Sequence, residues 1–502
     1  MHARKSILAA ILAALAPAAV VAGAVAQSMP GAAPGEAPAA NPSIAAAPAP
    51  ATATASDDAV TELRREIAAL RSDYERRMAD LEARLATLAP PLPFEASGTA
   101  KPSPAPAEAI AGVATGGGAA ESTPVPAPLT LLSGAAGKNY LNLSLDGIFA
   151  AGASTASDVE ALQTGGHDPV QRGFTVQNVE MVLEGAVDPY FRGQANVILQ
   201  ISPEGETVVE LEEVYATTTA LPGGLQLKAG QFFTEFGRLN TSHPHSWDFV
   251  DQPLVNGRFF GGDGLRSVGA RVSWLLPTAF YSEAFLGIQN SQGETLTSFR
   301  SVPGETLFGR EVVLREVTSA GDLLFAPRYT ASFDLTDTQT LLLGASAALG
   351  PNGTGESGKT SIYGIDGFWK WKSPTAFKGF PFFKVQGELM YRDLAADAAP
   401  DSGLAATDFE DWGGYLQANW GYRPGQVVGL RLDRVGGDTG DPGDPALESR
   451  LRLSPVWTWF PTEYSKLRLQ YNFDQGDALE RDEHSLWLQL EFLLGAHAAH
   501  KF

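Results

Sequence analysis

The chain has 502 residues, with 53 Gly, 34 Pro and no Cys, and only 19% of its residues are charged. The 36 Lys+Arg and 57 Asp+Glu give a net charge of −21, which argues against nucleic acid as a partner because phosphate binding needs a basic face. The lack of Cys excludes disulfides, zinc fingers and a Cys nucleophile, and a mean hydropathy of −0.06 argues against a membrane protein built from helices.

Residues 1–26 have the pattern of a secretory signal peptide. Arg4 and Lys5 precede an apolar run from Ile7, and Ala-Val-Ala at 24–26 supplies the small residues of a cleavage site. We therefore expect export. A transmembrane anchor is the alternative interpretation, because the apolar run is about long enough to span a bilayer.

Two linkers and a helix are expected next. Residues 27–56 are rich in Ala and Pro and predict an extended linker. Residues 57–89 carry apolar side chains at heptad spacing, and Pro90 ends this helix. An isolated helix of this length is marginal in water, so we expect a self-associating coiled coil; a lone amphipathic helix is the alternative. Residues 90–136 return to Pro, Ala and Gly and predict a second linker.

From 137 to 502 the sequence alternates between apolar and polar residues, as in KLRLQYNFD at 466–474. These runs are connected alternately by a short turn and a long loop. The connection between the third and fourth strands is the exception, because a long loop is expected there and it is short. This layout predicts an all-β fold: a closed transmembrane antiparallel β-barrel of about 16 strands, or alternatively 18, with both chain ends on the short-turn side. A soluble β-sandwich is the other possibility. The sixteen candidate strands begin near residues 139, 172, 190, 206, 224, 264, 278, 323, 338, 359, 380, 408, 426, 447, 464 and 483.

A barrel of this size leaves an aqueous lumen, and polar residues on its inner face would line that lumen. Acidic candidates on the early strands and basic candidates on the late strands would set up a transverse field; the alternative is that these charges pair with one another. The pore-lining candidates are Glu180, Glu184, Arg192, Glu210, Glu212, Lys384, Arg431, Arg450, Arg452, Lys466 and Arg468.

The connection at 235–263 is too long for a simple hairpin. We predict that it folds into the lumen and narrows the channel. Histidine and carboxylate side chains can bind zinc, but H-x-H spacing alone is a weak signal, so we favour a structural role and predict no metal, cofactor or catalytic residue. The constriction candidates are Arg238, His243, His245, Asp248, Asp251 and Arg258, with His243 and His245 as the weak zinc candidates.

The acidic excess is concentrated in three segments. Residues 393–411, 436–448 and 474–484 together hold fifteen acidic residues and one basic residue. We expect all three to be solvated surface loops. The run GGDTGDPGDP at 436–445 resembles a calcium-binding loop only loosely, because the required ligand spacing is missing.

LKAGQFFTEFG at 227–237, the coiled coil before a barrel and the C-terminal Phe502 resemble the porin O/P-like superfamily of Gram-negative outer-membrane channels. The segments LEEVYATTTALPGGLQLKAGQFF and HPHSWDFVDQPLV are similar to uncharacterised proteobacterial barrels, some described as zinc-regulated or TonB-dependent receptors. The resemblance implies a trimeric diffusion channel in the outer membrane, with Phe502 recognised by the barrel assembly machinery. The chain lacks the Lys-rich constriction of phosphate-selective members, and a TonB receptor needs about 22 strands and a globular plug.

We therefore expect an outer-membrane porin, trimeric through its barrel and coiled coil, with the coiled coil in the periplasm and lipid around the barrel. Small hydrophilic solutes or ions would diffuse through it without a chemical step or a cofactor. The alternatives are a substrate-selective or zinc-selective receptor, an outer-membrane enzyme and an envelope tether.

Overall fold

The computed structural model describes residues 129–133, 139–186, 188–313, 315–438 and 447–495. The expected signal peptide, first linker and coiled coil, most of the second linker, the GGDTGDPGDP run from residue 439 onward and the C-terminal Phe502 lie outside these residues. No helix in the described ranges is long and apolar enough to cross a membrane.

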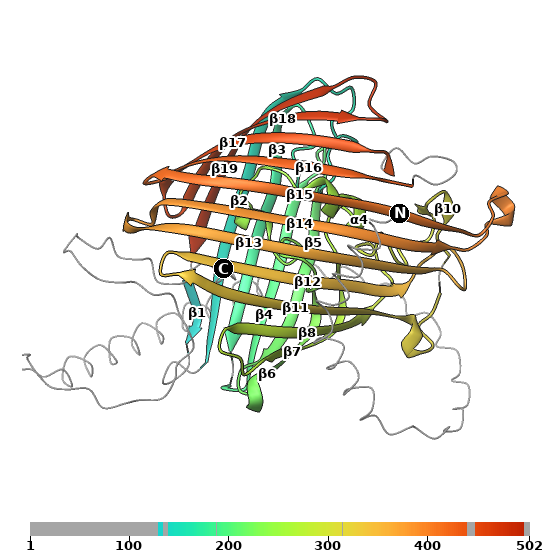
Figure 1. Ribbon diagram of the computed structural model, residues 1–502, viewed down its shortest axis with the longest axis horizontal. Coiled ribbons are helices and arrows are strands. Elements are labelled where there is room, and N and C mark those ends of the chain that lie inside the picture. The colour runs from blue at the N-terminus through green and yellow to red at the C-terminus, as the bar shows by residue number, and fades with distance from the viewer. Residues whose placement is uncertain (1–128, 134–138, 187, 314, 439–446, 496–502) are drawn as a thin grey trace, which may run out of the picture. The chain divides into compact units, whose positions relative to one another are not determined.

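A closed ring of antiparallel strands dominates the structure (Figure 1). The sixteen strands of the ring are β2 (Tyr140–Ser154), β3 (Gly173–Ala186), β4 (Phe191–Ile201), β5 (Thr207–Thr218), β6 (Leu225–Phe233), β7 (Arg266–Leu275), β8 (Tyr281–Asn290), β11 (Leu323–Thr336), β12 (Gln339–Pro351), β13 (Lys359–Phe377), β14 (Phe380–Ala396), β15 (Thr407–Arg423), β16 (Gln426–Gly437), β17 (Arg450–Thr462), β18 (Ser465–Gly476) and β19 (Glu483–Gly495). Neighbours in chain order pair, β8 pairs with β11, and β19 pairs with β2. The ring therefore has no free edge, which confirms the closed barrel of sixteen strands.

The connections alternate in length as the sequence predicts. Seven short turns lie at one end of the barrel, here called the turn end, and eight connections, most of them longer, lie at the other, the loop end. Each strand begins within three residues of its predicted position. The shortest connection at the loop end, 202–206, joins β4 to β5.

Several small elements lie outside the ring of strands. Strand β1 (Leu129–Ser133) falls in the range expected to be linker, and it pairs with the first residues of β2, beyond the point where β19 ends. The long connections hold α4 (Leu254–Phe260) and a small hairpin of β9 (Thr306–Leu307) and β10 (Arg310–Glu311). The 3-10 turns within the described residues are η2 (Pro222–Gly224), η3 (Pro244–Ser246), η4 (Ala320–Asp322) and η5 (Pro400–Ser402).

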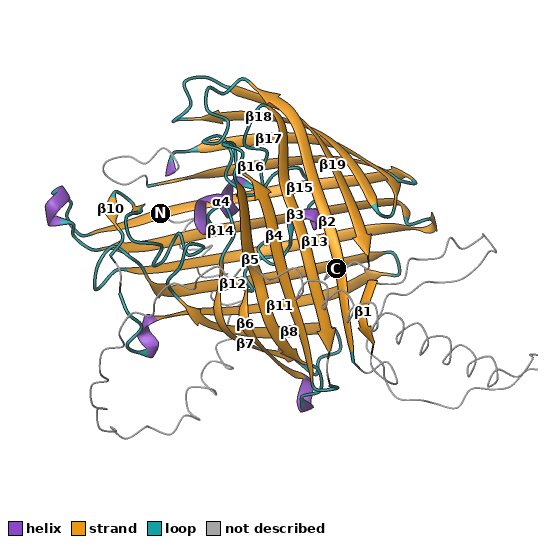
Figure 2. Cartoon of the chain, turned by 180° about the vertical axis from the view of Figure 1, so that it is seen from behind, coloured by secondary structure: helices purple, strands orange, loops and turns teal. Residues whose placement is uncertain are grey.

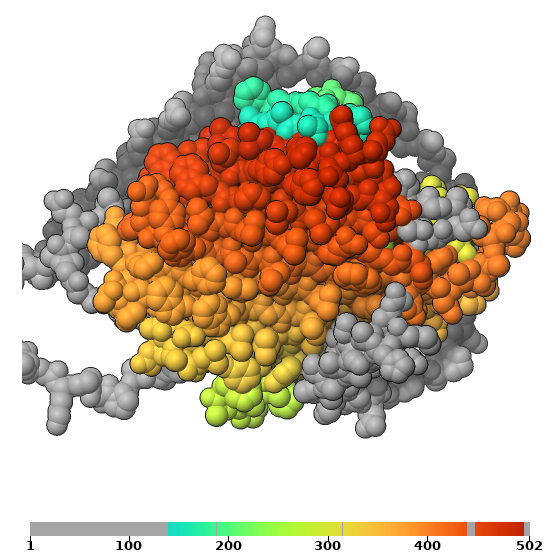
Figure 3. All heavy atoms as spheres, turned by 45° about the horizontal axis from the view of Figure 1, so that its top comes forward, coloured from blue at the N-terminus to red at the C-terminus, as the bar shows by residue number. Residues whose placement is uncertain are grey.

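The two faces of the barrel wall differ in polarity, as β16 shows. Leu430 and Leu432 are 48% and 45% exposed, whereas Arg431 and Asp433 between and after them are 1% and 0% exposed. Successive side chains of a strand point to opposite faces, so the leucines lie on the outside and the charges inside. Figure 3 shows the late strands following one another across this outer surface in chain order.

The inside of the barrel holds an apolar core as well as charges. Figure 2 shows α4 within the outline of the strands, and α4 contacts β15 and β16. Residues from the two longest connections and from the inner wall bury one another almost completely. The core consists of Phe236, Leu254, Val255, Phe259, Phe260, Leu265, Leu296, Phe299, Leu324, Ala348, Ile362, Met390, Tyr415 and Val435.

Candidate functional site

The connection between β6 and β7, residues 234–265, is here called the inner segment because its contacts are with the inner face of the wall. It leaves β6 through a tight turn at Gly237, whose φ is 58°. The Glu388 carboxylate on β14 accepts the backbone N–H groups of Arg238 at 3.2 Å and Leu239 at 2.8 Å. A wall carboxylate thus holds the start of the segment inside the barrel.

Asp248 connects the inner segment to β14 and β15. Its carboxylate lies 2.6 Å from Nζ of Lys384 and accepts hydrogen bonds from Gln417 at 3.0 Å and Asn419 at 3.2 Å. Lys384 and Asp248 each keep 24% of their side-chain surface exposed. Water therefore reaches the inner segment at this contact.

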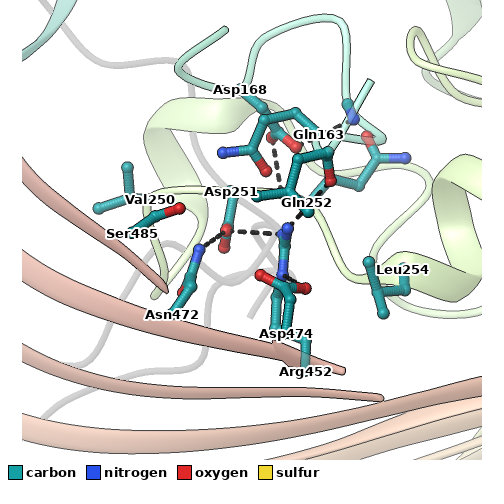
Figure 4. A network of polar contacts seen from close by, with 12 residues as sticks. Gln163, Asp168, Val250, Asp251, Gln252, Leu254, Arg452, Asn472, Asp474 and Ser485 are labelled. Atoms are coloured by element: carbon teal, nitrogen blue, oxygen red, sulfur yellow. Dashed lines mark hydrogen bonds and ion pairs between the residues drawn. The ribbon is translucent and has the colours of Figure 1, made fainter. Parts of the chain in front are cut away.

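Asp251 is the centre of a buried network (Figure 4). One carboxylate oxygen lies 2.7 Å from Nη2 of Arg431, and the other lies 2.9 Å from Nη1 of Arg452. The amides of Gln470 and Asn472 also donate to this carboxylate. Burial raises the pKa of Asp251, but the two guanidinium groups outweigh burial and hold the pKa below its ordinary value.

The late-strand cations also bind backbone carbonyls of the inner segment. Lys466 donates to the carbonyl of His245 at 2.8 Å, and Arg468 donates to that of Phe249 at 3.0 Å. Arg258 of the segment and Arg392 of the wall share the carboxylate of Asp411, each at 2.8 Å. Charged and polar groups of β14 to β18 therefore hold the segment along much of its length.

Two histidines of the inner segment meet glutamates of β3 and β5. Nδ1 of His243 lies 3.2 Å from Oε1 of Glu180 and 2.9 Å from Oε2 of Glu212. Nε2 of His243 lies 3.0 Å from Oε2 of Glu213, and Nδ1 of His245 lies 2.8 Å from Oε2 of Glu180. This histidine–glutamate cluster is buried, with Glu180 and Glu212 at 0% and 1% exposure.

A β-bulge explains why two consecutive glutamates reach this cluster. Asn196 pairs with Glu213, but its neighbour Val197 pairs with Leu211, so one extra residue is inserted in β5. A bulge changes the direction of a side chain that regular alternation would send to the other face. Glu212 and Glu213 are therefore both buried. Strict alternation, on which the sequence prediction relied, did not identify Glu213.

The connection 155–172, at the loop end, contacts both the inner segment and the histidine–glutamate cluster. The carboxylate of Asp168 accepts the backbone N–H of Gly165 at 2.9 Å and that of Gln252 in the inner segment at 2.8 Å. Burial, and next the nearby carboxylate of Asp251, raise the pKa of Asp168 to about 7. His167 in the same connection lies 3.6 Å from Glu212. Neither residue was among the sequence candidates, because no motif marks this loop.

The sequence candidates separate into two groups by exposure. Glu184 and Arg192 form a pair 3.7 Å apart with exposed surface, and Lys384, Glu210 and Arg450 are also partly exposed. The other six are 9% exposed or less, and they contact the inner segment or paired wall charges. Those six are Glu180, Glu212, Arg431, Arg452, Lys466 and Arg468. Inside the barrel these six side chains contact the inner segment or opposite charges of the wall, and which of the eleven candidates line the passage stays a prediction.

The expectation that the three acidic segments are solvated surface loops is wrong for some of their residues. Asp411, Asp474 and Glu483 belong to strands and are at most 6% exposed. Asp474 lies 2.8 Å from both Arg450 and Arg452. Part of the acidic excess that was expected on solvated loops therefore neutralises buried cations inside the barrel.

These features define a class: a closed β-barrel with an apolar outside, a polar inside and a folded segment within. No family model matches the chain. It is 31% identical over 361 residues to an uncharacterized protein of Aquifex aeolicus (strain VF5). The alignment covers 67% of this chain and 73% of that protein. The chain belongs to the same family as the Aquifex protein. The barrel described in this chain has sixteen strands, fewer than the roughly 22 of TonB-dependent receptors.

Solved structures of outer-membrane proteins align with the chain at low identity. The channel DcaP of Acinetobacter baumannii is 11% identical, with a TM-score of 0.47 and coverage of 72% of this chain and 100% of that chain. OmpF of Salmonella typhi, in complex with daunomycin, is 10% identical, with a TM-score of 0.45 and coverage of 71% and 98%. The anion-selective porin from Comamonas acidovorans is 9% identical, with a TM-score of 0.44 and coverage of 71% and 100%.

Proposed function

We propose that this chain is an outer-membrane channel of the porin type through which small hydrophilic solutes or ions diffuse. The observation that carries the proposal is the closed sixteen-stranded barrel with exposed leucines outside and charged residues inside. In lipid every backbone polar group must be paired, and a closed barrel meets this need. Transport of this kind needs no chemical step and no cofactor.

The inner segment would make this channel narrow. It is bound to β3 and β5 and also to wall strands between β14 and β18. We expect the passage to run past the partly exposed Lys384 and Asp248. The conductance should therefore be smaller than that of a sixteen-stranded barrel with an open lumen.

The remaining parts of the proposal rest on sequence patterns outside the described residues. We infer a homotrimer formed through the barrel and the coiled coil, with the coiled coil in the periplasm. We also infer that Phe502 is recognised by the machinery that assembles outer-membrane barrels. Chemical cross-linking of the protein in its native membrane, with and without residues 57–89, tests the trimer.

Planar-bilayer recording tests the channel itself. Purified full-length protein should give small, stepwise single-channel conductance, and the reversal potential in a salt gradient gives the ion preference. Replacing residues 240–261 with a short Gly/Ser linker should raise the conductance, because it removes most of the inner segment. The matched control shortens the exposed connection between β14 and β15 and should leave conductance unchanged. Absence of stepwise conductance in both the wild type and the shortened-segment variant would rule out the porin proposal.

A further inference from the structure

The histidine–glutamate cluster has the composition of a metal site. One ligand atom from each of Glu180, Glu212 and His243 can be chosen so that all three lie within 4.8 Å of one another. Two come from the wall strands β3 and β5, and the third comes from the inner segment. The three are therefore brought together only when the segment is folded inside the barrel.

Distances within the cluster fit ligands around one small ion. Nδ1 of His243 is 2.9 Å from Oε2 of Glu212 and 3.2 Å from Oε1 of Glu180. Two ligands at about 2.0–2.1 Å from a tetrahedral ion are separated by about 3.3 Å. Nδ1 of His243 and Oε2 of Glu212 are both buried and contact each other, but not in hydrogen-bond geometry. These two buried atoms therefore lie where two ligands of one ion would lie.

The surrounding contacts match the outer shell of known metal sites. A ligating histidine commonly donates its second ring N–H to a carboxylate, which fixes the tautomer and the ring orientation. Nε2 of His243 lies 3.0 Å from Oε2 of Glu213, and in the tautomer in which Nε2 carries the proton, Nδ1 offers its lone pair to an ion. Glu180 is held in turn by Asn196 at 2.5 Å and His245 at 2.8 Å. Both ligand side chains are oriented by partners that would not themselves contact the ion.

The charge of the cluster also favours a cation. Glu180, Glu210, Glu212 and Glu213 bring four carboxylates, and Arg266 beside Glu210 and Glu212 brings one guanidinium. Buried charges are stable only when they are paired or coordinate a metal. The missing positive charge must come from protons on the imidazoles or from a bound cation.

We propose that Glu180, Glu212 and His243 bind a divalent transition-metal ion of the zinc class. Imidazole nitrogen with carboxylate oxygen suits such ions better than Mg²⁺ or Ca²⁺, which prefer oxygen ligands alone. The ion would tie the inner segment to β3 and β5. This site goes beyond the proposed function and does not depend on it, because binding can be measured whether or not the barrel conducts.

The test uses full-length protein in detergent, stripped with a chelator and titrated with Zn²⁺ by calorimetry. The absorption spectrum of bound Co²⁺ reports direct coordination independently of transport. We expect one site per chain, unaffected by excess Mg²⁺. His243→Ala and Glu212→Gln should each weaken binding by about 100-fold or more, and the outer-shell change Glu213→Gln by about 10–100-fold.

Two control variants address other histidines. His484→Ala removes a histidine on β19 that contacts Tyr471, and H497A/H500A removes those near the C-terminus. Both controls should retain the site. The proposal is overturned if the wild type does not bind Zn²⁺ below about 1 mM, or if binding is lost in H497A/H500A but kept in His243→Ala. Should His243→Ala fail to fold, the nearly isosteric Glu212→Gln decides: unchanged Co²⁺ absorption there overturns the site.

Discussion

Nη1 of Arg452 on β17 lies 2.9 Å from Oδ2 of Asp251 in the inner segment, and neither side chain has exposed surface. The same carboxylate binds Arg431 on β16 at 2.7 Å. One acidic residue of the segment thus contacts two buried guanidinium groups of the wall, each of which also contacts a wall carboxylate. The position of the segment and the charge balance of the barrel interior are therefore linked.

Replacing Asp251 with Ala should destabilise the folded barrel. The change removes the carboxylate but leaves both arginines buried, and breaking a buried pair in this way costs about 3–5 kcal/mol. Asp433 and Asp474 still contact the arginines, so we expect the lower end of that range. The free energy of unfolding in urea, measured in lipid vesicles, gives the value. Glu480→Ala, at an exposed position on the loop end, is the control, and equal stability of the two variants would contradict the prediction.

Gly237 should not tolerate a side chain. Its φ of 58° is unfavourable for other residues by about 1–2 kcal/mol, and an added Cβ would lie 2.0 Å from Oε2 of Glu388. Gly237→Ala should displace that carboxylate from the N–H groups of Arg238 and Leu239 and loosen the start of the inner segment. Thermal unfolding and faster proteolysis within residues 238–262 measure the effect.

The matched control for this change is Gly367→Ala on β13. An added Cβ there would lie 3.6 Å from the side chain of Leu343, which is ordinary contact. We expect that variant to unfold as the wild type does. If Gly237→Ala unfolds and is cleaved like the control, the turn is not what positions the segment.

The barrel wall could be predicted from the sequence because each strand carries its own signal. Alternation in runs such as 466–474, bounded by turn residues, depends on local contacts with lipid on one face and polar groups on the other. The bulge in β5 has no such signal. It depends on how β4 and β5 pair, and a shift of one residue reverses which face a side chain occupies.

The interior of the barrel was harder to predict for a related reason. The length of 235–263 indicated a folded segment, but its partners lie far away in the sequence: Asp251 meets Arg452, and Arg258 meets Asp411. Periodicity places a charged residue on the inner face without saying which opposite charge it will meet. Asp411 and Asp474 were assigned to surface loops because composition was averaged over segments that cross strand ends.

Asp168 should make stability depend on pH. Its pKa is about 7 in the folded protein, against about 3.9 in an unfolded chain, so the folded state holds the proton more tightly. The stabilisation that this proton provides is full below about pH 4 and is lost as the pH rises to about 7. Asp168→Asn cannot ionise, so its stability relative to the wild type should improve between pH 5 and pH 8. Urea unfolding at both values measures the change.

Asp158→Asn in the same connection is the control, because Asp158 accepts one backbone hydrogen bond at an exposed site. Its difference from the wild type should stay the same at pH 5 and pH 8. A constant difference for Asp168→Asn as well would show that Asp168 carries its charge in the folded protein throughout this range.

Leu488 tests whether the outer face meets lipid. It is 50% exposed near the middle of β19, where an arginine in the bilayer centre would destabilise a barrel by about 2–4 kcal/mol. Leu221, 43% exposed in the turn between β5 and β6, lies at the turn end, where the same change should cost about 0–1 kcal/mol. Folding of Leu488→Arg and Leu221→Arg into phospholipid vesicles, followed in urea, gives the two differences. Equal effects would mean that the apolar face of β19 does not lie in the hydrocarbon layer, because depth is the property that separates the two positions.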